Sequence, residues 1–323
     1  MNMQSWLTRP IVATALSAAA VSAVVTMSMT QTSGQASRPA RTADGKPNFG
    51  GVWQALNEAQ WDLQAHEPRA GMVTQRGVYD YDYARVPAAP VVALGAAAGV
   101  PGSLGVVSGD GQIPYKPEMA AIKQQNSENW IDRDPELKCY LPGIPRALYM
   151  PYPFAIVQGA EKIHMTFAFS NAGRVIHLNK VEPPPDDTYM GHSVGRWEGD
   201  TLVVDVDHFN GKNWFDRAGN FHSEELKLTE KYSPISPDAI RYEATINDPK
   251  TFTRPWTISM PLYRRLEPNA TVIDYPCIEF SEEFMYGHLR KEQLVKRWEG
   301  ETMTVEITRK IPQGDKLHEW YRR

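Results

Sequence analysis

The second half of the chain consists largely of short segments in which apolar and polar residues alternate, separated by turn residues. Residues 163–169 alternate in this way, and the turn residues 170–173 lead into a second alternating segment, 175–179. A period of two is typical of a strand with one buried face, and a turn between two such strands predicts a hairpin. Pairing about this turn predicts that Phe167 lies opposite Ile176.

Two more hairpins follow. In the first, Gly199-Asp200 has the composition of a two-residue turn, which would place Trp197 opposite Leu202 and His192 opposite Asp207. In the other, residues 226–232 and 240–246 flank a Pro-Ser-Pro-Asp turn. Alternation then puts four residues of its first strand on one face: Leu226, Leu228, Glu230 and Tyr232.

Additional elements are short. We expect a strand near 48–53 and a helix over 117–128, with Pro117 in its first turn. The sequence Arg196–Thr201 (RWEGDT) recurs as Arg297–Thr302 (RWEGET), which predicts a second hairpin of the same kind. Strands are also expected at these ranges: 256–264, 271–275, 293–298 and 302–309.

The fold class follows from this pattern. Many hairpins with almost no amphipathic helix predict a mainly β protein, and a long meander hides its edges by closing. We therefore expect an antiparallel meander that closes into a barrel or half-barrel over residues 136–323. A loop-rich region, 37–135, precedes it with the first strand, the short helix and a Pro/Gly/Ala flap at 86–114. The 25 prolines and 23 glycines fit the turns and the flap.

The N-terminus has the composition of a targeting segment. Residues 11–30 carry no charge, follow the basic residue Arg9 and precede small residues at Gly34 and Ala36. This predicts a secretory signal peptide over 1–36 and a periplasmic or secreted protein, with an uncleaved membrane anchor as the alternative. After cleavage we expect no stable membrane span. In an oxidising compartment Cys139 and Cys277 form a disulfide or remain two buried thiols, and the sequence leaves both open.

Charge limits the class of partner. The formal net charge is −4, so no strong positive field is available for nucleic acid. Nucleotide cofactors are not expected either, because the Gly-rich stretch from Gly105 to Gly111 lacks a lysine and a following helix. The expected partner is a small apolar or aromatic molecule, and the oligomeric state stays open.

Two resemblances bear on the fold. The run GHSVGRWEGDTLVVD, residues 191–205, resembles the hallmark of an exported bacterial family of hypothetical proteins, as do three shorter runs at 214–216, 221–223 and 248–256. That resemblance implies no particular activity. Asn48-Phe49 with Gly51-Val52-Trp53 is similar to the G-x-W first strand of lipocalin-like (calycin) barrels, and residues 273–275 are similar to their later T-D-Y turn. This second resemblance implies a cup-shaped barrel with an apolar ligand cavity.

The second hairpin supplies the first candidate site. His192 opposite Asp207 would be a general base whose tautomer the carboxylate fixes, and Arg196 on the same face would hold an anionic group. The alternative is a solvated outer face with an ordinary ion pair. His177, on the polar face of the first hairpin, would contact substrate if that face lines the cavity; the sequence does not say which way it points.

Residues 208–224 form a long connection rich in aromatic residues and histidine, which is typical of a lid or site wall. Asp216 and His222 would supply proton chemistry, and His208, Trp214 and Phe221 would contact the ligand. A loop pinned by its own aromatic residues is the equal alternative.

Glu230 is the third candidate. A carboxylate on an otherwise apolar face is costly unless it is paired, and it is often prepared in this way as a general acid. The alternative is a glutamate that reaches solvent or pairs with an arginine. A metal site would use His192, Asp207, His208 and His222, but no typical ligand spacing supports it, so we expect no metal.

Together these features predict an exported enzyme that performs cofactor-independent acid–base chemistry on a small, largely apolar or aromatic compound bound in the cavity of the β-barrel. The reaction would be that of a lyase, isomerase or hydrolase. A lipocalin-like carrier of a hydrophobic ligand, without catalysis, is the alternative.

Overall fold

A computed structural model of the chain describes residues 40–70, 99–128, 133–278, 292–299 and 302–310. The expected signal peptide and residues 86–98 of the expected flap lie outside the described residues.

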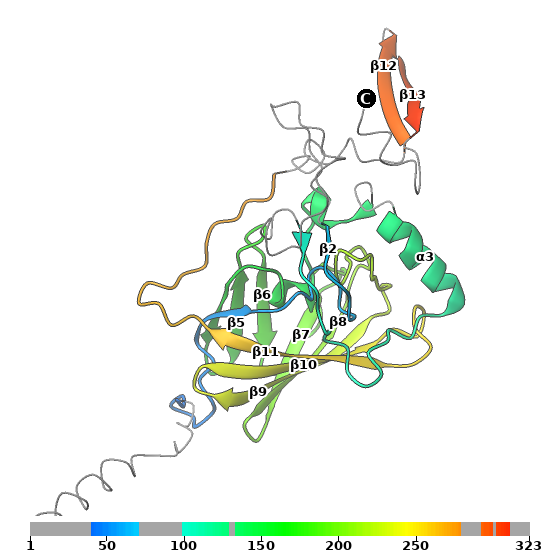
Figure 1. The fold of residues 1–323 in the computed structure, drawn as a ribbon. Helices are drawn as coiled ribbons and strands as arrows, with labels where there is room; N and C mark the ends of the chain where they lie inside the picture. Colours follow the sequence, from blue (N-terminus) through cyan, green and yellow to red (C-terminus); the bar gives the residue numbers. More distant parts are fainter. Residues whose placement is uncertain (1–39, 71–98, 129–132, 279–291, 300–301, 311–323) are drawn as a thin grey trace, which may run out of the picture. The chain divides into compact units, whose positions relative to one another are not determined.

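Nine strands form a closed barrel (Figure 1), which confirms the expected mainly β class, and the described residues contain one short α-helix. Around the barrel the order is β1-β11-β10-β9-β8-β7-β6-β5-β4, and β6 with β7 is its parallel pair. The strands are β1 (Gly51–Ala55), β4 (Phe154–Gln158), β5 (Lys162–Phe167), β6 (Gly173–His177), β7 (His192–Glu198), β8 (Thr201–Asp207), β9 (Lys227–Ser236), β10 (Ala239–Asn247) and β11 (Trp256–Arg264).

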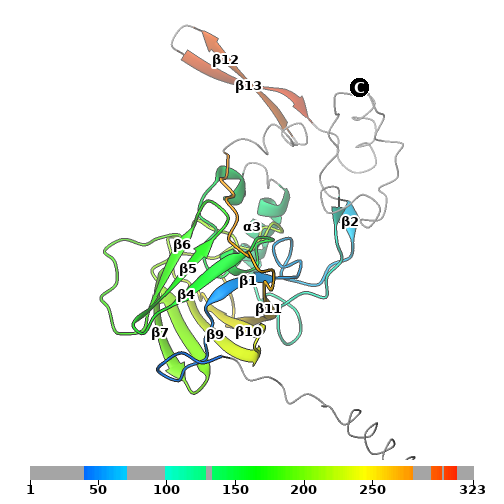
Figure 2. The same ribbon diagram turned by 90° about the vertical axis from the view of Figure 1, so that its left-hand side faces the viewer.

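The barrel closes through β1, which comes from the loop-rich region that precedes the other barrel strands. It pairs with β4 on one side and with β11 on the other (Figure 2). Trp53 therefore lies opposite both Phe154 and Arg264. The Trp53 side chain is buried, its indole N–H donates to the Phe49 carbonyl at 2.8 Å, and the Arg264 guanidinium lies over its ring. These contacts fix β1 at the seam.

The second hairpin has the predicted register, with Trp197 opposite Leu202 and His192 opposite Asp207. In the third hairpin the four residues predicted to share a face are all buried: Leu226, Leu228, Glu230 and Tyr232. The predicted pairing of Phe167 with Ile176 is wrong: Ile176 lies opposite Ile163. The reason is that the turn lies two residues earlier than predicted: Thr166 pairs with Gly173, and the turn between them includes two left-handed residues, Ser170 and Asn171. The shift is even, so the inner and outer faces are unchanged.

Several smaller elements lie outside the barrel. Helix α3 (Pro117–Glu128) has the predicted bounds. Strands β12 (Glu292–Glu299) and β13 (Thr302–Lys310) form a separate two-stranded sheet with Trp298 opposite Met303, which confirms the second RWEG hairpin. The remaining short elements are β2 (Arg69–Ala70), β3 (Gly99–Val100) and the 3₁₀ turns η2 (Glu136–Lys138) and η3 (Arg146–Leu148).

The expected strand at 271–275 is absent from this described part of the chain. Tyr275 forms only an isolated bridge with Phe169, and its carbonyl accepts from the Ser170 amide at 3.1 Å. The segment is held instead by a disulfide between Cys139 and Cys277, which settles the question that the sequence left open. A covalent tie to a loop takes the place of strand pairing here.

The inward-facing side chains of the barrel strands are buried and pack together. Alternate residues of each strand point inward and form one apolar cluster, which includes Phe154, Met165, Val204, Ile246 and Leu262. In the described part of the chain, no helix is both long and apolar enough to cross a membrane.

Candidate functional site

A group of histidines lies on the outer wall of the barrel, where β6, β7 and β8 meet. Residues 193 and 195 of β7 point inward, so His192 points outward, and the register places Asp207 directly opposite on the same face. The His192 Nδ1 atom lies 3.9 Å from the Asp207 Oδ1 atom. The pairing predicted from the turn is therefore present, at a distance longer than a hydrogen bond.

His208 joins this pair through an unusual backbone conformation. In a regular strand, adjacent side chains point to opposite faces. His208 instead has φ of 56°, a left-handed conformation that is costly for a residue with a β-carbon. Its side chain then turns back to Asp207, with 2.8 Å between His208 Nδ1 and Asp207 Oδ1. The Thr188 amide, which donates to the His208 carbonyl at 2.9 Å, helps to hold this conformation.

Gly191 brings His192 close to that turn. Its φ is 69°, and a β-carbon at this position would meet the Val206 side chain at 2.8 Å and the Asp207 carbonyl oxygen at 2.9 Å. Only glycine permits both the conformation and the close approach. The absence of a side chain at Gly191 therefore lets the backbone at the start of β7 lie close to the end of β8.

A groove of about 440 Å³ lies beside this cluster. His177, at the end of β6, lines the groove together with His192, and their ring centroids are 5.9 Å apart. Burial lowers the pKa of His177, and Lys162 and His192 lower it further. The other residues that line the groove are mixed in polarity and include Val175, Val181, Glu182, Pro184, Thr188 and Met190.

Two nitrogens in this region are buried without a hydrogen-bond partner among the described residues: His177 Nδ1 and His192 Nε2. Three of the side chains also offer ligand atoms that lie within 4.8 Å of one another, namely His192, Asp207 and His208. A second groove, of about 340 Å³, includes Asp207 in its lining. The cluster thus stands between two surface depressions, and its donor set is one that can bind a metal ion.

Glu230 lies elsewhere, inside the barrel. Its carboxylate pairs with the Arg174 guanidinium and accepts hydrogen bonds from the hydroxyls of Tyr232 at 3.0 Å and Tyr242 at 2.8 Å. Arg174 also donates through Nε to the Ser193 hydroxyl at 2.9 Å. Glu230 is therefore paired with an arginine, which the sequence analysis gave as one alternative to a general acid. The arginine lies on β6, and both side chains are buried.

The loop at 208–224 is held in place by its own side chains. The buried Asp216 carboxylate accepts hydrogen bonds from the amides of Leu63, Ala218 and Asn220 and from the Asn220 side chain. Burial, together with the nearby Asp62 carboxylate, raises the pKa of Asp216 to about 7. The hydrogen bonds that the carboxylate accepts act in the opposite direction and lower the pKa. These bonds connect the loop to itself and to the segment after β1.

The aromatic residues of that loop complete its packing. His222 is buried between Phe209 and Phe215, and burial lowers its pKa. Trp214 is buried and forms a bridge with Phe221, whose ring stacks with that of Tyr115. Of the loop residues predicted to act on a ligand, His208 is the one that joins the cluster with His192.

Arg196 lies on the outer face of β7 but is engaged in ion pairs. Its Nε atom lies 2.9 Å from Glu198 and its Nη1 atom 2.5 Å from Asp205. It does not belong to the lining of the groove beside His192.

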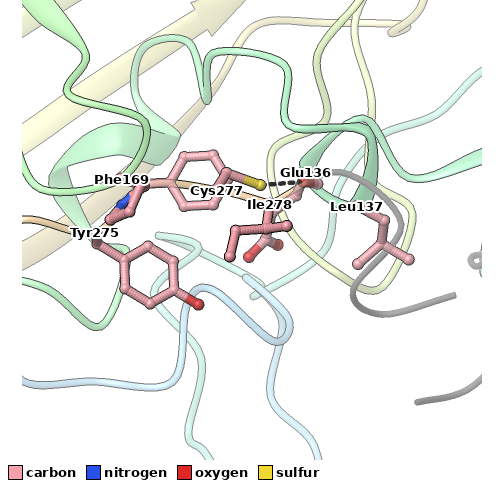
Figure 3. A pocket seen from close by; sticks show the side chains of 7 residues that line it. Glu136, Leu137, Phe169, Tyr275, Cys277 and Ile278 are labelled. Carbon is pink, nitrogen blue, oxygen red and sulfur yellow. Dashed lines mark hydrogen bonds between the residues drawn. The ribbon is translucent and has the colours of Figure 1, made fainter. Parts of the chain in front are cut away.

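A second buried ionic cluster, centred on Glu136, was not foreseen. Glu136 accepts from Gln60 and Arg217 and pairs with Arg146, which also lies 3.4 Å from Asp134. A cavity of about 220 Å³ lies next to it, bordered by Tyr275, Cys277 and Ile278 among others (Figure 3). These residues come from loops without periodicity, so no sequence pattern marks the cluster.

This cluster predicts acid sensitivity. Burial alone would raise the pKa of Glu136, but Arg217 and Arg146 lower it to about 2 from its ordinary 4.5. Because the folded pKa is depressed, the ionised carboxylate stabilises the fold above pH 4.5, and this contribution is lost as the pH falls toward 2. We expect the stability difference between the parent and Glu136→Gln, measured by urea unfolding, to be largest near neutral pH and to shrink over this window. A difference that does not change with pH would contradict the assignment, and Glu225→Gln on an exposed loop is the control.

Comparison with protein-family models, with curated proteins and with solved structures finds no match to this chain.

Proposed function

We propose that this protein is an enzyme that acts on a small molecule bound in the groove beside β6 and β7. The reaction is that of a hydrolase, lyase or isomerase, and His192, Asp207 and His208 carry the chemistry. The observation that carries the proposal is that His192 belongs both to the groove lining and to the cluster with Asp207 and His208.

The size and lining of the groove support a small ligand. A volume of about 440 Å³ falls in the range of small-molecule sites, which combine apolar walls with a few placed polar groups. Val175, Val181 and Met190 offer the apolar part, while His177 and His192 offer the polar part. A compound with an apolar body and one polar reacting group fits this surface. Because His177 and His192 alternate with the buried residues of their strands and point outward, we place the ligand on the outer wall.

Backbone strain supports a functional role for the cluster. The left-handed His208 costs on the order of 1–3 kcal/mol, and such conformations gather at active sites and ligand clamps. Its effect is to bring two adjacent side chains, Asp207 and His208, to one place. A surface ion pair alone does not need this conformation.

The test is a comparison of turnover in matched variants. The full chain is incubated with a metabolite extract, and mass spectrometry follows compounds that are consumed and formed. We expect turnover in the parent and in His164→Gln, an exposed histidine of β5 outside the groove lining. His192→Gln should lower the rate at least about 100-fold, because a group that transfers protons or activates water contributes that much.

Two results would count against an enzyme. If compounds are retained by the parent but not converted, the groove belongs to a carrier. If the same compounds are converted equally by the parent and by His192→Gln, the reaction takes place at another site.

A further inference from the structure

The three side chains at the groove edge have the composition of a metal-binding set. Two imidazoles and one carboxylate suit zinc and neighbouring divalent transition metals, whereas calcium and magnesium prefer oxygen ligands alone. Sequence spacing gave no reason to expect this set, because His192 is distant along the chain and Asp207 and His208 are adjacent. The left-handed His208 removes that objection by turning both adjacent side chains to one side.

The distances agree with a shared ion. Zinc lies about 2.0–2.2 Å from nitrogen and oxygen ligands, so two ligand atoms of one ion are separated by about 2.9–3.4 Å at octahedral or tetrahedral angles. In this structure Asp207 Oδ1 lies 2.8 Å from His208 Nδ1 and 3.9 Å from His192 Nδ1. All three ligand atoms lie within 4.8 Å of one another, so His192 must move toward the other two by roughly half an ångström or more to share one ion with them.

The surroundings also favour an ion. The side chain of His192 is 11% exposed, while those of His208 and Asp207 are 34% and 48% exposed. One ligand is thus fixed in the wall of the groove and the other two border solvent, which leaves room for water or substrate on the ion.

We propose that His192, Asp207 and His208 bind one divalent transition-metal ion, with zinc as the best fit. This proposal rests on the function proposed above, because the bound ion would be the reacting centre of the same groove. A metal ion with three protein ligands keeps a position open for water or substrate, which is the arrangement of catalytic zinc sites.

The experiment measures metal binding without any substrate. The full chain, produced without a polyhistidine tag and stripped with a chelator, is titrated with Zn²⁺ by calorimetry and with Co²⁺ by visible absorption. We expect one equivalent of Zn²⁺ to bind, Co²⁺ to give the spectrum of a site with nitrogen and oxygen ligands, and excess Ca²⁺ or Mg²⁺ not to compete.

Matched variants locate the ion. Asp207→Asn and His208→Gln should weaken Zn²⁺ binding at least about 100-fold, since loss of even an outer partner of a ligand costs about 10–100-fold. Asp205→Asn, two residues away on the same face of β8, and His164→Gln should change the affinity less than about twofold. Circular dichroism shows whether each variant is folded, and an anomalous difference map from a zinc-soaked crystal places the ion independently of any variant.

The outcomes test the metal site separately from the proposed enzymatic activity. Absence of Zn²⁺ binding by the parent, or binding unchanged in Asp207→Asn and His208→Gln, overturns the metal site and leaves turnover to be carried by the imidazoles. Zinc binding at this cluster in a protein that shows no turnover supports the metal site and refutes the enzyme.

Discussion

Replacement of Arg174 by alanine is expected to lower the free energy of unfolding by about 3–5 kcal/mol, because it leaves the Glu230 carboxylate buried without its counter-charge. Both side chains are at most 1% exposed, and the Ser193 and Tyr232 hydroxyls, at 2.9 and 3.3 Å, also lose a donor. The loss is a large part of the total stability of a typical domain. Urea unfolding followed by tryptophan fluorescence measures it.

The controls separate burial from charge. Replacement of both partners, Arg174→Met with Glu230→Leu, is made together with Tyr232→Phe and Tyr242→Phe, because the two hydroxyls would otherwise lose their acceptor. It should restore much of the lost stability, because an apolar pair needs no counter-charge. Arg265→Ala breaks an exposed pair with Glu267 and should leave the unfolding midpoint near that of the parent. Equal destabilisation by Arg174→Ala and by the combined replacement would show that shape rather than the ion pair holds this part of the barrel.

Loss of the disulfide is the second large effect that we expect. Cys139 and Cys277 are 138 residues apart, and a cross-link over such a loop stabilises a fold by about 3–5 kcal/mol, mainly by restricting the unfolded chain. The double variant Cys139→Ser/Cys277→Ser should therefore unfold at clearly lower urea concentration than the oxidised parent.

A reducing agent provides the control for this prediction. It should move the midpoint of the parent to that of the double variant and should not affect the double variant itself. If the midpoint of the double variant equals that of the oxidised parent, the bond serves only to hold residues 265–278 locally.

The sequence was informative where structure is local. The two-residue turn at Gly199-Asp200 sets the register of its hairpin, so the face shared by His192 and Asp207 could be predicted from the turn alone. The longer turn after Phe167 could not be assigned in this way, since several loop lengths fit the same residues. Its register depended on two left-handed residues that are not glycine.

The remaining features depend on contacts between distant segments. Arg174 and Ile176 are two residues apart and both point inward, but the sequence analysis did not consider Arg174, and nothing local identifies Glu230 as its partner. His208 was predicted as a ligand contact of a lid, and its place beside Asp207 depends on one dihedral angle that no pattern encodes. The ionic cluster at Glu136 joins four loop segments, so it appears only in the folded chain.

The position of β1 has a consequence for the order of folding. Trp53 pairs with Arg264, so the contact that completes the barrel spans more than two-thirds of the described chain from residue 40 to 310. Contacts between residues so far apart in sequence form slowly. β1 can pair with β4 once residue 158 has been made, but its other edge has no partner until β11 follows. In that interval the free edge of β1 is a place where aggregation would begin, and so is the edge of β11 before it pairs with β1.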